Sequence, residues 1–206
     1  MNNDQEKLEL NVERLQSGDR SEFARLVEQY SDLIYRLAIR MLGDDQDAED
    51  VLQETFLKAY RSIGSFQGQS NISTWLYRIA TNEALMLIRK RKPENQRMEI
   101  DEKDAEEDSA PLQIVDWAAL PEEQLLSGET LDYLNQIVQN LSPALRIVFL
   151  LRDVMDQSVR ETAEVLGIGE SAVKTRLSRA RLQLRQQLST YFDEDHVNKG
   201  IVYGKI

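Results

Sequence analysis

Apolar side chains in the first 91 residues recur every three or four positions, the spacing of amphipathic helices, and no stretch alternates as a strand does. We expect a short helix at 8–16, stopped by Ser17-Gly18, and a longer helix at 20–42, terminated by Gly43. The predicted core stripe of the longer helix is Phe23, Leu26, Val27, Tyr30, Ile34, Leu37, Ala38 and Met41.

Two more helices are predicted before residue 93. The third covers 46–63, with Asp44 and Asp45 as candidate N-caps. The loop at 65–71 leads to a fourth helix at 73–91, which Pro93 closes. The predicted core stripe of the third helix is Ala48, Leu52, Phe56, Ala59, Tyr60 and Ile63.

The helical pattern returns near Pro121. Ser142-Pro143 reads as an N-cap followed by the first helical residue. The tail at 193–206 has no periodicity, and we expect it to be disordered. The helices predicted in this half are 122–127, 129–140, 143–155, 159–166 and 170–190.

The segment between these halves, 94–121, contains nine acidic residues and only two cations, Arg97 and Lys103. Such a composition cannot bury enough apolar surface to fold alone. It is either a solvated tether or a segment that docks through Leu112, Ile114, Val115 and Trp117. The fold class is therefore all-α, with helical domains at 8–93 and 122–192 joined by a flexible acidic linker.

The net charge of −11 taken alone argues against nucleic-acid binding. The cations are concentrated, however: residues 73–92 carry five cations against one acid, Glu83. The absence of cysteine excludes disulfides, and no apolar run reaches the ~20 residues of a membrane span. The N-terminus has no signal-peptide pattern, so a cytoplasmic protein is expected.

Residues 158–170 carry a helix-turn-helix signature. Ser158 and Glu161 form a capping box, and Gly167 permits the left-handed conformation of a tight turn between helices. The helix that follows has an apolar stripe and, mostly opposite it, a face of hydroxyls and cations suited to a major groove. The alternative is a solvated basic helix at the surface of a bundle.

The third and fourth helices carry two further faces. In the fourth helix Trp75 and the nearby Phe66 place aromatic rings beside cations, which suits unpaired bases, although Trp75 could instead be core. The third helix exposes Leu57 within an acidic patch, which suggests a protein partner with basic residues, unless it is an ordinary solvated face.

Three blocks in this order resemble the extracytoplasmic-function (ECF) sigma factors of the sigma-70 family. Residues 47–60 resemble the family's helix that binds core RNA polymerase. Phe66 with 73–82 resembles its −10 recognition loop and helix, and 166–181 its −35 reader. The sequence departs from the family pattern at three places. Gly169 occupies a position that is often a serine N-cap, Met155-Asp156-Gln157 occupies a turn that usually contains glycine, and the 193–206 tail extends past the usual domain end.

The resemblance implies a sigma factor that directs promoter-specific initiation, with core polymerase, promoter DNA and an anti-sigma factor as partners. Core-polymerase contacts would come from Asp47, Asp50, Gln53, Glu54 and Leu57. The −10 contacts would come from Phe66, Trp75, Arg78, Asn82, Arg89 and Lys90. The −35 contacts would come from Ser171, Lys174, Thr175, Ser178, Arg179, Arg181 and Arg185.

Three other functions are alternatives to a sigma factor. A conventional helix-turn-helix regulator would bind duplex DNA without polymerase, and a decoy would only bind a regulator. A nucleic-acid enzyme needs a catalytic set, and none is visible, because the single histidine, His196, lies in the tail. The acidic run 101–108 lacks the glycine and spacing of a calcium loop. We therefore expect no catalysis, no metal, no cofactor, no small-molecule substrate and no membrane insertion.

Overall fold

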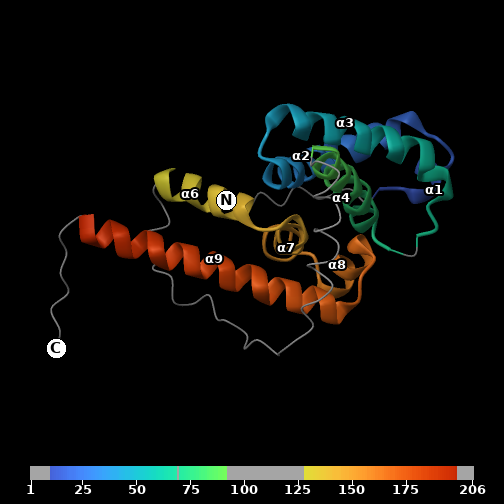
Figure 1. The fold of residues 1–206 in the computed structure, drawn as a ribbon. Coiled ribbons are helices and arrows are strands. Elements are labelled where there is room, and N and C mark those ends of the chain that lie inside the picture. Colours follow the sequence, from blue (N-terminus) through green and yellow to red (C-terminus); the bar gives the residue numbers. More distant parts are fainter. Residues whose placement is uncertain (1–9, 69, 92–127, 199–206) are drawn as a thin grey trace, which may run out of the picture. The chain divides into compact units, whose positions relative to one another are not determined.

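The computed structural model describes residues 10–68, 70–91 and 128–198, and the regular elements in these ranges are all helices (Figure 1). Helices between Val12 and Ile88 belong to one unit, and most of the chain from Gly128 to Asn198 belongs to a second. The all-α prediction is confirmed. The predicted linker at 94–121, the predicted helix at 122–127 and the end of the tail, 199–206, lie outside the described residues.

The first unit contains helices whose ends follow local capping chemistry. Gly43 ends the second helix with a φ of 72°, and Asp44 caps the third by accepting from the Asp47 N–H, both as predicted. The first helix begins at Val12 rather than at 8, because Asn11 is extended and caps it. The elements are α1 (Val12–Gln16), α2 (Arg20–Leu42), α3 (Asp45–Ser62), the 3₁₀ turn η1 (Ile63–Ser65) and α4 (Ile72–Arg91).

The buried side of α3 differs from the prediction in one respect. Tyr60 was expected in the core, but it is 46% exposed, with its ring edge-on to Phe23 of α2 at a centroid distance of 5.0 Å. The buried arc is instead rotated toward Val51 and Thr55, which are 1% and 0% exposed. Rotation in that direction carries Tyr60 out of the core and carries Asp47 into it.

The described chain after residue 127 contains α6 (Gly128–Asn140), α7 (Pro143–Phe149), the π-helical segment η4 (Leu150–Val154), α8 (Val159–Leu166) and α9 (Glu170–Asn198). The Ser142 hydroxyl caps α7 as predicted. The core between α6, α7 and α9 consists of Ile137, Leu141, Leu145, Ala180, Leu184 and Leu188.

Helix α9 is longer than predicted, since it continues to Asn198 instead of ending at 190. The helix therefore includes the first six residues of the predicted tail, 193–198. Packing against α6 continues one residue beyond the predicted end of the helix: the Tyr191 ring stacks on Tyr133 at a centroid distance of 4.1 Å, and the Tyr133 hydroxyl donates to the Gln187 carbonyl at 3.1 Å.

Candidate nucleic-acid and protein interfaces

The capping box and the tight turn of the helix-turn-helix are both present, as the sequence predicted. The Ser158 hydroxyl accepts from the Glu161 N–H at 3.1 Å, and the Glu161 carboxylate accepts from the Ser158 N–H at 2.8 Å. Gly167 has a φ of 66°, and the Ile168 N–H donates to the Ala163 carbonyl at 3.2 Å. The start of α9 is thereby fixed relative to the end of α8.

The turn before α8 is built without glycine. Asp156 stands in the left-handed region with a φ of 52°, where glycine would be free of steric cost. The π-helical segment ends at Val154, just before this turn. The Gln157 N–H donates to the Leu151 carbonyl at 2.9 Å, and the Arg152 guanidinium donates to the Gln157 carbonyl. Backbone and arginine hydrogen bonds thus hold a turn whose sequence departs from the family pattern.

The polar face of α9 carries the residues predicted for −35 DNA. Ser171, Lys174 and Arg185 are exposed, and three more of the predicted residues are half-buried: Thr175, Ser178 and Arg179. The residues from 171 to 185 span about 21 Å of helix at 1.5 Å per residue, enough to lie along a major groove. This face offers hydroxyls and cations, as a reader of base edges and phosphates requires.

Arg181 requires a correction. Its guanidinium donates twice to the Asp153 carboxylate of the π-helical segment, at 2.8 and 2.6 Å, and its side chain is only 25% exposed. The same hydrogen bonds raise the pKa of Arg181. A bidentate pair of this kind occupies the donors that a phosphate contact would use. In this structure Arg181 therefore holds α9 to the segment before the turn instead of standing open to DNA.

Phe66 also requires a correction. It was predicted to offer an aromatic face to DNA, but it is 6% exposed, and its ring lies 5.3 Å from that of Trp75. The apolar ring finds a better environment against the core than in the loop, and Trp75, half-buried, retains some open surface. Of the two aromatic candidates, only Trp75 remains accessible to a base.

The exposed face of α4 is cationic. Arg78, Asn82, Arg89 and Lys90 are all exposed, as their proposed roles require. Met86, which the sequence did not single out, is 41% exposed, and its spacing of four residues from Asn82 places it on the same face.

The one acid of α4, Glu83, faces elsewhere. Its side chain is 10% exposed, and its carboxylate forms an ion pair with Lys58 of α3, with 2.6 Å between Oε1 and the lysine Nζ. Lys58 also lies 3.8 Å from Glu54 on its own helix. The acid in the middle of the basic helix is thus buried and paired, and no signal within α4 alone could have revealed the partner.

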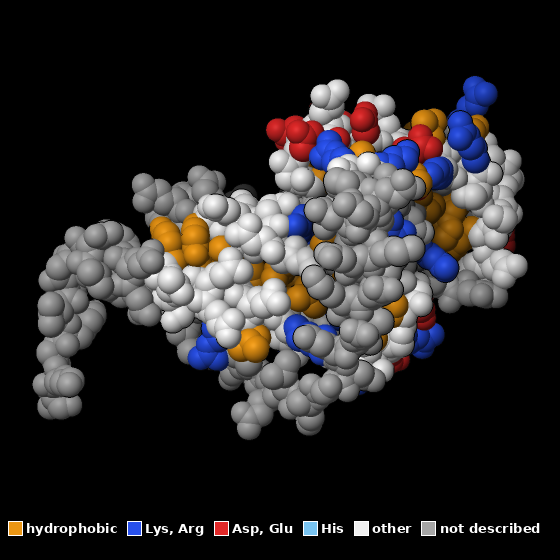
Figure 2. All heavy atoms as spheres, viewed as in Figure 1, with side chains coloured by type: hydrophobic (Ala, Val, Ile, Leu, Met, Phe, Trp, Pro, Cys, Tyr) orange, Lys and Arg blue, Asp and Glu red, His pale blue; other side chains and the backbone are white. Residues whose placement is uncertain are grey.

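The exposed side of α3 is acidic and includes one exposed leucine. Asp50 and Gln53 are exposed, and Leu57 is 49% exposed. Acidic side chains gather along the part of the surface where α3 lies (Figure 2). Asp47 is the exception among the predicted contacts, since it is 7% exposed and belongs to the buried arc. Glu49, which was not predicted, is exposed beside Asp50.

The described residues provide neither a membrane-spanning helix nor a cluster of metal-ligand side chains. No helix there is both long and apolar enough to cross a membrane. In the same ranges, no three His, Cys, Asp or Glu side chains are grouped as metal ligands would be.

Two family models match the chain. Residues 26–94 match the model described as Sigma-70 region 2, and residues 131–184 match Sigma-70, region 4. The first match includes α3, the loop and α4, and the second includes the helix-turn-helix and ends within α9. The C-terminal part of α9 lies beyond the matched range.

Curated relatives cover most of the chain. The ECF RNA polymerase sigma factor SigW of Bacillus subtilis is 39% identical over 86% of this chain and 94% of its own length. The RNA polymerase sigma-H factor of Pseudomonas aeruginosa is 35% identical over 89% of this chain and 94% of its own. The ECF RNA polymerase sigma-E factor of Escherichia coli is 34% identical over 82% of this chain and 88% of its own.

Two solved structures share the fold. One is CnrH in complex with the cytosolic domain of CnrY, with a TM-score of 0.63 over 87% of this chain and 95% of that one. The other is RpoE in complex with the anti-sigma factor NepR from Bartonella quintana, with a TM-score of 0.59 over 82% of this chain and 98% of that one. Both are 24% identical to this chain.

Proposed function

Because this chain belongs to the extracytoplasmic-function branch of the sigma-70 family, we propose that it directs RNA polymerase to promoters by reading two DNA elements with two separate helix faces. The observation that carries the proposal is the distribution of charge. A chain of net charge −11 exposes a cationic face on α4 and a hydroxyl and cation face on α9. Phosphate contacts require such local cations, whatever the total charge.

The −10 element is read by α4 and the loop before it. Asn82 holds an unpaired base, Trp75 supplies the ring on which it stacks, and Arg78, Arg89 and Lys90 hold phosphates. Stacking an extruded base on an aromatic ring contributes about 1–3 kcal/mol. That offsets much of an unstacking cost of a few kcal/mol. Phe66 acts indirectly in this proposal, since its buried ring supports Trp75.

The −35 element is read by α9. Lys174, Thr175, Ser178 and Arg179 face the base edges and nearby phosphates of duplex DNA, with Ser171 at the start of the helix and Arg185 on the backbone. Residues near the N-terminus of a recognition helix reach the base edges, and the position of Ser171 and Lys174 in the first turns of α9 supports this role.

The acidic face of α3 binds core polymerase. Asp50, Gln53 and Glu54 meet a basic surface, and the exposed Leu57 supplies the apolar contact. The acidic linker at 94–121 threads a basic channel of the polymerase. We place the domain borders at 8–93 and 122–198, with the second border moved to the end of α9.

Regulation and place in the cell follow from the family. We propose that an anti-sigma factor binds this protein, since the structural neighbour RpoE is in complex with the anti-sigma factor NepR. We propose a cytoplasmic protein that joins the nucleoid in holoenzyme or is held at the membrane by that regulator. The protein has no catalytic role or cofactor of its own, because the polymerase carries out the chemistry.

The deciding experiment is transcription in vitro with purified bacterial core polymerase and fragments of genomic DNA. The proposal predicts discrete transcripts that depend on this protein and share upstream −10 and −35 sequences. Binding to duplex DNA as a dimer without core, together with no promoter-specific transcript, would instead identify a conventional helix-turn-helix regulator. Binding to a regulator with neither activity would identify a decoy.

A further inference from the structure

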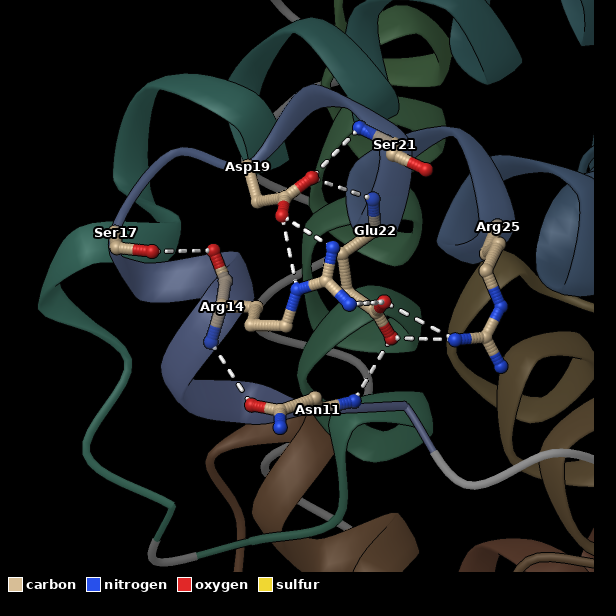
Figure 3. A network of polar contacts seen from close by, with 7 residues as sticks. All are labelled: Asn11, Arg14, Ser17, Asp19, Ser21, Glu22 and Arg25. Carbon is tan, nitrogen blue, oxygen red and sulfur yellow. Dashed lines mark hydrogen bonds and ion pairs between the residues drawn. The ribbon is translucent and has the colours of Figure 1, made fainter.

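The short helix α1 has no role in the functions described so far, yet both apolar packing and several hydrogen bonds hold it against the rest of the first unit. Leu15 is 1% exposed. The junction between α1 and α2 is a network of polar contacts (Figure 3). Asn11 caps α1, and Asp19 caps α2 by accepting from the Ser21 and Glu22 N–H groups at 2.9 and 3.1 Å.

Two charged groups tie the caps together. Arg14 donates to Asp19 at 2.9 and 2.6 Å, which lowers the pKa of the Asp19 carboxyl. Glu22 is 1% exposed, and it accepts from the Asn11 N–H at 2.8 Å and from Arg25 at 3.0 Å. A buried carboxylate is tolerated only when it is paired in this way. The network therefore fixes both ends of α1 against α2.

The far end of α1 reaches the loop before α4. The Gln16 side-chain amide donates to the Phe66 carbonyl at 2.5 Å. A Cβ on Gly64 of η1 would lie 3.6 Å from the Gln16 carbonyl oxygen, so the end of α1 lies directly against the 3₁₀ turn. Phe66 is the residue at which that turn ends and the extended loop begins.

Phe66 is thus held from three sides. Its N–H donates to the Ile63 carbonyl at 3.1 Å, its carbonyl accepts from Gln16, and its ring lies against Trp75. The first and third of these contacts come from the elements that the loop connects. The Gln16 contact comes from α1, outside these elements, and holds the backbone where the extended loop begins.

We propose that Gln16 is a positioning residue for −10 recognition, and that α1 with its polar network is the brace that holds it. This inference rests on the proposed function, because the loop that Gln16 orients is the one that meets the unpaired −10 strand. Gln16 touches no DNA. It sets the path of the loop and the surroundings of Trp75, so that an unpaired nucleotide meets a preformed site.

The test compares Gln16→Met, which keeps the length of the side chain but has no donor, with Gln16→Lys, which restores a donor at similar reach. Ser17→Ala is the matched control, since the Ser17 hydroxyl donates to the Arg14 carbonyl within α1. All are assayed as holoenzyme. The probes are a fork-junction promoter fragment with an unpaired −10 strand and a duplex carrying only the −35 element, both from a promoter selected with the wild-type holoenzyme.

Gln16→Met is expected to weaken binding to the fork about three- to tenfold, the effect of one hydrogen bond. Binding to the −35 duplex and to core polymerase should not change. Gln16→Lys should restore fork binding to within about twofold, and Ser17→Ala should equal wild type. A Gln16→Met variant that binds the fork as well as wild type would overturn the inference, as would one that weakens fork and −35 binding equally.

A spectroscopic measurement separates this inference from the proposed function. In the free protein carrying Trp117→Phe, without core polymerase, Trp75 is the sole tryptophan. Gln16→Met should then shift the Trp75 emission without DNA, and Ser17→Ala should not. An unchanged emission overturns the brace even where promoter activity is intact. If the wild-type holoenzyme selects no promoter, the proposed function fails, and a shifted emission would still show that Gln16 orients the loop.

Discussion

Helices α4 and α9 are both basic, but the structure adjusts their charge in opposite directions. On α4 an ion pair with Lys58 takes the one acid, Glu83, off the surface. On α9 an ion pair with Asp153 takes a cation, Arg181, out of the exposed face. Charges counted along a helix are therefore a poor guide to the charge that the helix presents, because partners elsewhere in the chain remove some of them.

The two helices also differ in how much of their surface is buried. Helix α4 buries seven residues, including Thr74, Thr81 and Glu83, so polar groups lie inside as well. Helix α9 buries a single stripe, Val173, Leu177, Ala180, Leu184 and Leu188, and leaves the remaining arc for contacts. Helix α4 therefore presents a narrower reading face than α9 does.

The largest effect is expected at Lys58. Lys58→Met leaves the buried Glu83 carboxylate without its partner, and the free energy of unfolding should fall by about 2–3 kcal/mol. Urea denaturation followed by circular dichroism measures this. Lys58→Arg should retain most of the stability, and Lys58→Met combined with Glu83→Gln should recover most of the loss. Equal stability of Lys58→Met and wild type would show that the pair does not matter.

On α9 the contrast lies between two cations. Lys174→Ala should weaken binding of the holoenzyme to −35 duplex by about 1–2 kcal/mol, or roughly five- to thirtyfold. Arg181→Ala should change it by less than about twofold, because Arg181 is already engaged by Asp153. Fluorescence anisotropy at fixed salt measures both. Similar losses for the two variants would mean that Arg181 leaves its ion pair to contact DNA.

The turn that leads to α8 gives a smaller effect. Asp156 has a φ of 52°, so Asp156→Ala should lower the free energy of unfolding by about 1 kcal/mol relative to Asp156→Gly. Thermal melts of both variants measure the difference. If Ala and Gly were equally stable, the left-handed turn would not constrain the helix-turn-helix.

The smallest effect is a change in salt dependence. Asp153→Asn weakens the ion pair that holds Arg181, so that Arg181 becomes able to contact one DNA phosphate. The slope of log K for binding of −35 duplex against log[salt] should then steepen by up to about 0.9, the value for one phosphate contact. Asp156→Asn is the control, because it changes the net charge equally from a position outside the Arg181 pair. Identical slopes for the two variants would assign the change to net charge alone.

Features that depend on neighbours within about four residues were predictable from the sequence. The caps by Asp44, Ser142 and Ser158 and the glycine ends at Gly43 and Gly167 were all anticipated, because each is a local match between a side chain and a free backbone group. The order of the helices followed from the same signals.

Features that join distant parts of the chain were not predictable. The pairs Lys58–Glu83 and Asp153–Arg181 join residues 25 and 28 positions apart (83 − 58 and 181 − 153), and no periodicity marks them. The rotation of α3 that buries Asp47 depends on how α2 packs against it. Phe66 was misjudged because an aromatic ring in a loop can pack against the core or face solvent, and local sequence does not distinguish these.

In the proposed function, one protein reads two promoter elements with two faces, and only within a polymerase complex. Its most direct test places a photo-crosslinking amino acid at Met86 on the α4 face and, separately, at Ser171 on the α9 face, both of them exposed. With core polymerase on one promoter, position 86 should crosslink to the unpaired −10 strand and position 171 to the −35 duplex. Crosslinking at position 171 without core, and none at position 86 in its presence, would contradict the account.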